Sequence, residues 1–146
     1  RKAMARPKVR EDFVAAADIL KTHAAVNGRI GVVGFCYGGG IANLLATRLP
    51  DLAAAAPYYG PAPAAEEVAK IKARMLVQYA GNDERITAGW PAYEEALKKA
   101  GVRYEGFVYP STEHGFNNDT TPRYDEAAAK QSWDRTMALF NQALRS

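Results

Sequence analysis

Cys36 is the only cysteine of the chain, and glycines flank it in the segment Gly34-Phe35-Cys36-Tyr37-Gly38. Residues 30–35 are apolar and β-branched, which is typical of a buried parallel strand, and residues 38–49 have helical spacing. Only a sharp turn joins a strand to a helix over so few residues, and glycines leave room for it. Such a turn projects its central side chain at the carboxyl end of the strand, where the helix N-terminus favours a thiolate. The pattern predicts a nucleophile elbow with cysteine in the serine position and the Tyr37 N–H as oxyanion donor.

A thiol nucleophile needs a base, and the base needs an acid that orients it. Of the two histidines, His23 lies in the first predicted helix and is expected at the surface, whereas His114 lies in a polar loop after the fourth predicted strand. Asp83 follows the third predicted strand in Gly81-Asn82-Asp83. The chain order is therefore nucleophile, acid and histidine, each beyond the carboxyl end of a strand. This is the order of the α/β-hydrolases.

Each of these residues also has a plainer interpretation. Cys36 could be a small buried apolar residue, and Asp83 could be a turn residue or a helix N-cap. His114 with Asp83 and Glu113 could also be read as a set of metal ligands, but the two histidines are far apart in sequence and make a poor zinc set. We expect no metal and no other cofactor.

The rest of the sequence alternates between helical and strand patterns. Helices are predicted over residues 12–25, 38–49, 90–100 and 122–144, with a short helical or irregular link at 64–71. Strands are predicted over residues 30–35, 52–59, 74–79 and 103–109. This succession predicts an α/β fold with a parallel sheet of about four strands flanked by helices. No repeat, low-complexity tract or linker interrupts residues 1–146, which we treat as one domain.

The last predicted helix is amphipathic. Its apolar residues recur along one stripe: Tyr124, Ala127, Trp133, Met137, Phe140 and Leu144.

Composition excludes several classes of protein. The chain is 48% hydrophobic and 24% charged, as in ordinary globular proteins, and its formal net charge of +3 is too small to indicate nucleic-acid binding. Five basic residues cluster near the start, at Arg1, Lys2, Arg6, Lys8 and Arg10, and we expect a solvated arm there. No stretch has the length of a membrane span, so we expect no membrane partner. A lone thiol cannot form an internal disulfide, which suits a cytoplasmic location.

The sequence resembles the dienelactone hydrolases, or carboxymethylenebutenolidases, of the α/β-hydrolase superfamily. The matching segments are Gly34-Phe35-Cys36-Tyr37-Gly38-Gly39, Gly81-Asn82-Asp83 and His114-Gly115-Phe116, with similar separations. The resemblance implies that Cys36 is the nucleophile, His114 the base and Asp83 its orienter. It implies hydrolysis of a small ester or lactone through a covalent thioester.

The chain also departs from this family. Members carry further strands before the segment at which this sequence begins, and the resemblance implies that those strands supply the second oxyanion N–H. Dienelactone-cleaving members hold the substrate carboxylate with arginines, and one of these corresponds to Asn118; Arg85 and Arg123 are nearby in sequence. Candidates for the pocket wall are the following residues: Tyr58, Tyr59, Arg85, Trp90, Phe116 and Asn118.

Two other interpretations remain. Glutamine amidotransferases also have a cysteine elbow, but they show a His-x-Glu pair where this chain has His114-Gly115-Phe116. Alternatively, the chain is a folded but catalytically incomplete fragment or subunit. Half of a parallel sheet exposes an edge strand, so such a fragment would dimerise through that edge or bind an N-terminal companion segment.

Overall fold

The computed structural model describes residues 6–145, so Arg1 and Lys2 of the basic cluster lie outside the described residues. Ten elements follow in order: α1 (Arg6–Thr22), β1 (Gly31–Phe35), α2 (Tyr37–Arg48), β2 (Ala54–Tyr58), α3 (Ala65–Val68), β3 (Arg74–Ala80), α4 (Glu84–Thr87), α5 (Trp90–Lys99), β4 (Tyr104–Tyr109) and α6 (Glu126–Leu144). Helix α1 begins well before the predicted residue 12, so Lys8 and Arg10 belong to a helix and not to an arm. Lys8 pairs with Asp12 one turn later.

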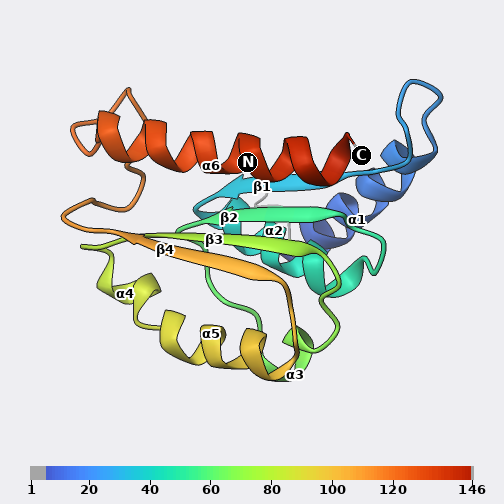
Figure 1. Ribbon diagram of the computed structural model, residues 1–146, viewed down its shortest axis with the longest axis horizontal. Coiled ribbons are helices and arrows are strands. Elements are labelled where there is room, and N and C mark those ends of the chain that lie inside the picture. The colour runs from blue at the N-terminus through green and yellow to red at the C-terminus, as the bar shows by residue number, and fades with distance from the viewer. Residues whose placement is uncertain (1–5, 146) are drawn as a thin grey trace.

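The four strands form one parallel sheet in the order β1-β2-β3-β4. Phe35 at the end of β1 is opposite Tyr58 at the end of β2, and Tyr58 is in turn opposite Gln78 of β3. The predicted parallel sheet of four strands flanked by helices is confirmed. All four carboxyl ends therefore lie at one edge of the sheet, where Cys36 and the loops after β3 and β4 also begin (Figure 1).

Helices cover both faces of this sheet. Helix α6 crosses one face alone, while α1, α2 and α5 lie on the other side (Figure 1). The face under α2 and α5 buries an apolar cluster whose main members are Ile41, Leu45, Met75, Val77, Tyr93 and Leu97. Because β2 and most of β3 are buried on both faces, their sequences do not alternate between apolar and polar residues, and Gln78 is a polar side chain that is fully buried there.

Helix α6 turns a different side to the sheet than its sequence predicts. Apart from Leu139, its buried residues are small or polar, namely Ala128, Ala129, Ser132 and Thr136, whereas Tyr124, Trp133 and Met137 of the predicted stripe are exposed. Only the C-terminal part of the stripe packs inward, where Phe140 and Leu144 lie against Gly31. Asp125 caps the helix by accepting a hydrogen bond from the Ala128 N–H, so α6 begins four residues after the predicted Pro122.

A buried polar network explains this orientation. The fully buried Gln78 donates through Nε2 to Thr136 Oγ1 at 3.1 Å and accepts the Tyr109 hydroxyl at 2.6 Å. The Tyr58 hydroxyl also contacts Thr136 Oγ1, at 2.8 Å, and Arg135 donates to the Tyr109 hydroxyl. Buried polar groups are costly unless they are hydrogen-bonded. The side of α6 that carries Ser132 and Thr136 must therefore face the sheet.

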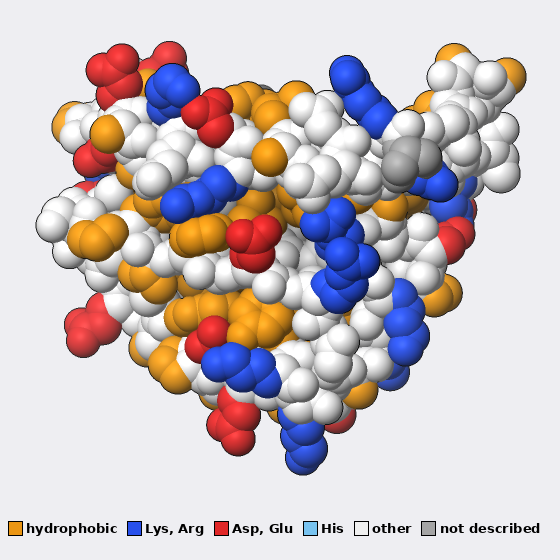
Figure 2. Space-filling model, in the orientation of Figure 1, with side chains coloured by type: hydrophobic (Ala, Val, Ile, Leu, Met, Phe, Trp, Pro, Cys, Tyr) orange, Lys and Arg blue, Asp and Glu red, His pale blue; other side chains and the backbone are white. Residues whose placement is uncertain are grey.

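Both edges of the sheet carry apolar side chains. Figure 2 shows apolar side chains gathered between α6 and α5, over edge strand β4, where Val108 is exposed and the Arg135 guanidinium lies 3.6 Å above the Phe107 ring. At the other edge, among residues 6–145, β1 pairs only with β2. Its last residue, Phe35, is exposed beside Trp133 of α6. No helix among the described residues is long and apolar enough to span a membrane.

Candidate active site

The turn between β1 and α2 is as sharp as the sequence predicts. Cys36 has φ 56° and ψ −118°, a left-handed conformation that strains a residue with a Cβ. The turn closes so tightly that a Cβ on Gly34 would lie 1.9 Å from the carbonyl oxygen of Gly38. By contrast, a Cβ on Gly38 would meet nothing within 4 Å. Gly34 is therefore the glycine that the strand–helix turn requires.

Further hydrogen bonds fix the elbow against the end of β2. The Cys36 N–H donates to the Tyr58 carbonyl at 3.1 Å, and the Cys36 carbonyl accepts the Gly39 N–H at 3.0 Å. Gly39 lies so close to β2 that a Cβ there would be 2.4 Å from the Tyr58 carbonyl oxygen. Tyr37 is the first residue of α2, where backbone N–H groups have no partner within the helix. The N-terminus of α2 is thus held beside the thiol.

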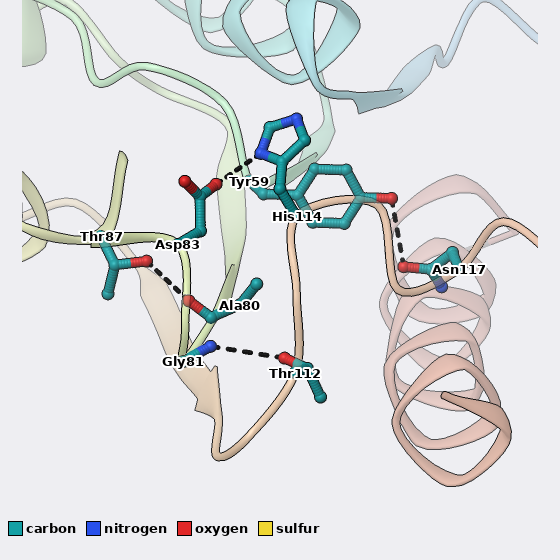
Figure 3. A network of polar contacts seen from close by, with 8 residues as sticks. All are labelled: Tyr59, Ala80, Gly81, Asp83, Thr87, Thr112, His114 and Asn117. Carbon is teal, nitrogen blue, oxygen red and sulfur yellow. Dashed lines mark hydrogen bonds and ion pairs between the residues drawn. The ribbon is translucent and has the colours of Figure 1, made fainter. Parts of the chain in front are cut away.

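His114 and Asp83 form a hydrogen-bonded pair at the same edge of the sheet. The His114 Nδ1 contacts Asp83 Oδ2, and the other ring nitrogen, Nε2, points away from Asp83 (Figure 3). The Asp83 side chain is 7% exposed and that of His114 is 28% exposed. Asp83 occupies the N-cap position of α4, but its carboxylate makes no capping hydrogen bond. It is therefore available to His114.

The loops that carry this pair are tied to each other. The buried Thr112 hydroxyl donates to the Tyr109 carbonyl at 2.8 Å and accepts the Gly81 N–H at 3.3 Å. The Asn82 backbone N–H donates to the Thr112 carbonyl at 2.8 Å, and its side chain donates to Glu113 Oε1 at 3.1 Å. Figure 3 shows the Gly81–Thr112 contact directly below the Asp83–His114 pair. Asp83 and His114 are thus carried by two loops that are cross-linked to each other.

Backbone strain concentrates at the same edge. In the described part of the chain, three residues other than glycine have positive φ: Cys36, Tyr59 and Ser111. Cys36 directly follows β1, Tyr59 directly follows β2, and Ser111 comes two residues after β4. Such conformations cost of order 1–3 kcal/mol each and cluster at functional sites. Their position supports the carboxyl edge of the sheet as the functional one.

The thiol of Cys36 is partly buried, and burial raises its pKa above the ordinary value. The positive charge of Arg123 opposes this effect, and the negative charge of Asp83 adds to it. Burial therefore acts against the preference for a thiolate that the N-terminus of α2 is expected to give. A base must remove the proton when the nucleophile reacts.

This leads to a prediction for chemical modification. We expect iodoacetamide to alkylate Cys36 with a rate that rises with pH, because only the thiolate reacts. Since burial disfavours the charged form, the midpoint should lie at higher pH in the folded chain than in the same chain unfolded in urea. Mass spectrometry at a series of pH values measures both curves. A folded midpoint below the unfolded one would contradict the prediction.

One of the predicted pocket residues, Tyr59, lies beside the pair. The Tyr59 ring centroid is 4.9 Å from that of His114, and the Phe116 centroid is 5.4 Å from that of Tyr59. Tyr58, however, is fully buried and directs its hydroxyl to Thr136 under α6. Tyr59 is thus next to the histidine, whereas Tyr58 and Phe116 support it from the core.

The other pocket candidates lie elsewhere. Trp90 packs on the α5 face of the sheet against Tyr79 and Tyr104, in space that Gly106 leaves open, so its proposed place in the pocket is corrected. Asn118 is exposed and accepts the backbone N–H and hydroxyl of Thr120, which makes it a turn residue. Arg85 is exposed on α4, two residues after Asp83, and its role stays a prediction.

Sequence reasoning missed Thr112 and Asn117. Asn117 links Tyr59 to α6: its Oδ1 accepts the Tyr59 hydroxyl at 3.4 Å, and its Nδ2 donates to Ser132 Oγ at 3.2 Å. The only signal in the sequence was its distance of three residues from His114. Arg123 is close to His114 in sequence, and its positive charge favours the thiolate form of Cys36.

Two surface cavities flank the site without enclosing it. One, of about 480 Å³, runs along α2 from Tyr37 toward Pro61 and Leu44, and the other, of about 490 Å³, lies between Phe35 and Trp133. Neither is lined by Cys36, Asp83 or His114. Among the described residues, no group of three or more His, Cys, Asp or Glu side chains is arranged to hold a metal ion.

Comparison with known proteins agrees with this geometry. The model of the dienelactone hydrolase family matches residues 1–144. A "Putative carboxymethylenebutenolidase" of Saccharolobus solfataricus is 34% identical over 142 residues, which cover 94% of this chain and 54% of that protein.

Solved structures give the same result. The crystal structure titled "Putative Dienelactone Hydrolase" from Klebsiella pneumoniae superimposes with a TM-score of 0.83 at 30% identity, covering 92% of this chain and 60% of that one. A dienelactone hydrolase from Anabaena variabilis, at 21% identity and a TM-score of 0.74, shows the shared fold. The chain spans about half the length of the curated relatives it matches. On this evidence, the chain belongs to the dienelactone hydrolase family.

Proposed function

We propose that this protein hydrolyses a small ester or lactone through a triad of Cys36, His114 and Asp83. The observation that carries the proposal is the Asp83–His114 pair at the sheet edge where the strained elbow presents Cys36. An acid that orients a histidine, next to a nucleophile on a sharp strand–helix turn, is the arrangement that acyl transfer requires. The buried carboxylate of Asp83 fixes the proton on Nδ1 and leaves Nε2 to act as the base.

The first half of the reaction forms a thioester. As the Cys36 sulfur attacks the carbonyl carbon, His114 Nε2 takes the thiol proton, and the carbonyl π electrons move onto oxygen. The backbone N–H of Tyr37 donates a hydrogen bond to this oxyanion. When the intermediate collapses, the bond to the alkoxy oxygen breaks and His114 returns the proton to the leaving alcohol. Because burial raises the pKa of the Cys36 thiol, we favour proton transfer to His114 during the attack over a preformed thiolate–imidazolium pair.

The second half releases the acid. His114 takes a proton from water as the water oxygen attacks the thioester carbon, and the carbon–sulfur bond then breaks. The proton returns to the thiolate, and the carboxylic acid leaves. No step needs a metal or a cofactor. The ring of Asp83-bound His114 serves as base and acid in turn.

Hydrolysis of 4-nitrophenyl acetate by the 146-residue chain tests this proposal. We expect steady release of nitrophenolate and, in quenched samples, an acetyl group on Cys36 that intact-mass and peptide mass spectrometry locate. Acetylation without turnover would show a competent elbow with impaired deacylation. Neither acetylation nor turnover would refute hydrolysis by this chain.

A second proposal is that the chain works only with a partner that completes the sheet. Among residues 6–145, β1 pairs only with β2, and the exposed Phe35 at its end lines a surface cavity together with the exposed Trp133 of α6. A companion segment or a second copy that pairs with β1 would cover them. Light scattering after size exclusion, combined with the nitrophenyl acetate assay, shows whether the active species is a monomer, a dimer or a complex with a companion segment. Activity that appears only in a dimer, or only when an N-terminal segment is added, supports this proposal.

The role of Asp83 gives a second test of the mechanism. Asp83→Asn should lower kcat by about 10²–10⁴-fold with little change in KM, because the amide cannot hold the required histidine tautomer. Asp134→Asn is the matched control, since Asp134 is exposed on α6 and pairs with the exposed Lys130 rather than with His114. Steady-state kinetics measures both. Equal effects of the two substitutions would contradict the assignment of Asp83.

A further inference from the structure

Tyr59 contacts His114 through its ring, and the residue before it is bonded to the elbow. The backbone of Tyr59 is in a strained conformation with positive φ. It has φ 35°, its N–H donates to the Gln78 carbonyl at 2.7 Å, and the preceding carbonyl of Tyr58 accepts the Cys36 N–H. Its ring lies on the side of His114 away from the loop that carries Asp83, at 4.9 Å and a tilt of 55° (Figure 3). Burial raises the Tyr59 pKa far above its ordinary value, so its hydroxyl remains a neutral donor.

Asn117 holds this ring from the other end. The Tyr59 hydroxyl donates to Asn117 Oδ1, and Asn117 Nδ2 donates to the Ser132 hydroxyl, which in turn donates to the Ala129 carbonyl at 3.0 Å. Ser132 is fully buried in α6. A chain of hydrogen bonds therefore runs from the rigid helix to the phenol, and it uses both ends of the Asn117 amide.

The charged groups around His114 and the Tyr59 ring contact different parts of the imidazole. Asp83 contacts Nδ1 of His114. The positive charge of Arg123 acts on the thiol of Cys36, whose pKa it lowers. Glu113, the chain neighbour of His114, is bonded to Asn82. The protonated imidazole that forms during attack therefore has Asp83 at one nitrogen and the Tyr59 ring at its side. An aromatic ring within about 6 Å of a cation stabilises that cation electrostatically.

We propose that Tyr59 and Asn117 are positioning residues for His114: Asn117 fixes the Tyr59 ring, and the ring holds the imidazole against Asp83. The proposal rests on the hydrolase function argued above. It assigns the Asn117 side chain a role that its exposed neighbour Asn118 lacks, because the Asn118 side chain bonds only within its own turn.

The matched pair Asn117→Ala and Asn118→Ala tests this in two ways. In the nitrophenyl acetate assay, Asn117→Ala should lower kcat roughly tenfold with KM within about twofold, and Asn118→Ala should leave kcat unchanged. Tyr59→Phe, which removes the same hydrogen bond, should match Asn117→Ala, and the double variant should lose no more than either alone. Tyr59→Leu, which also removes the ring, should lose more.

The second measurement needs no turnover. The proton shared by His114 and Asp83 should give a low-field proton NMR signal in the wild-type chain and in Asn118→Ala. We expect it to broaden or disappear in Asn117→Ala and Tyr59→Leu, while circular dichroism and thermal unfolding show that both variants are folded. An intact signal in those variants would overturn the positioning role, even if stability falls. A chain that gives the signal but neither becomes acetylated on Cys36 nor hydrolyses the ester would refute the proposed function separately.

Discussion

Replacing Cys36 with alanine is expected to lower kcat/KM for 4-nitrophenyl acetate by about 10³-fold or more, to the background rate. Removal of the attacking atom leaves only binding and oxyanion stabilisation, and the loss from a missing nucleophile is close to that from removing a whole triad. The fold should survive, because the substitution deletes one partly buried sulfur and alanine is no more strained than cysteine at φ 56°. Steady-state kinetics with far-ultraviolet circular dichroism checks both parts.

Cys36→Ser serves as the companion variant. It keeps an attacking oxygen within reach of the same base, so it should retain more activity than Cys36→Ala while losing reactivity toward iodoacetamide. Because the chain contains one cysteine, the labelling result needs no correction for other thiols. Hydrolysis at the same rate in wild type and Cys36→Ala would remove Cys36 from the mechanism and, with it, the thioester.

Replacing Gly34 with alanine is expected to destabilise the chain by about 3 kcal/mol or more and to abolish activity. The new methyl group would lie 1.9 Å from the Gly38 carbonyl oxygen and 2.3 Å from its carbon. Both are backbone atoms of the turn, so the clash can be relieved only by opening the elbow. Overpacking of this kind commonly costs 1–3 kcal/mol even where side chains can adjust.

Gly38→Ala is the matched control for that variant. A Cβ at position 38 has nothing within 4 Å, and alanine is favoured over glycine inside a helix by up to about 1 kcal/mol. We therefore expect Gly38→Ala to be neutral or stabilising in urea unfolding. If the two variants unfold at the same urea concentration, the tight turn is not what selects glycine at position 34.

The sequence was informative where residue type and strand position coincide. Cys36, Asp83 and His114 each follow a strand of a parallel sheet, and parallel strands bring their carboxyl ends to one edge. Asp83 and His114 are in contact for that reason, although they are 31 residues apart. The catalytic roles of these residues stay predictions until the variants are measured.

The sequence was misleading where burial is decided by hydrogen bonding. A hydrophobic pattern favours Trp133 and Met137 as the buried side of α6, but Gln78, Tyr58 and Tyr109 present polar groups on that face of the sheet. Their partners come from α6 through Thr136 and Arg135, a requirement that no periodicity in the helix reveals. Asn117 was overlooked in the same way, since its role depends on Ser132, a contact across 15 residues.

The acid and base belong to neighbouring strands, whereas the thiol is carried by β1 at the opposite edge of the sheet. Thr112 and Asn82 bind the two catalytic loops together, but the elbow is anchored to β2. Local unfolding that starts at β4 would therefore detach acid and base as one unit while the turn around Cys36 stays formed. In mild denaturant, hydrolysis should then disappear before the Cys36 thiol becomes fully accessible to solvent. The chain would pass through a partly folded state that does not hydrolyse the ester.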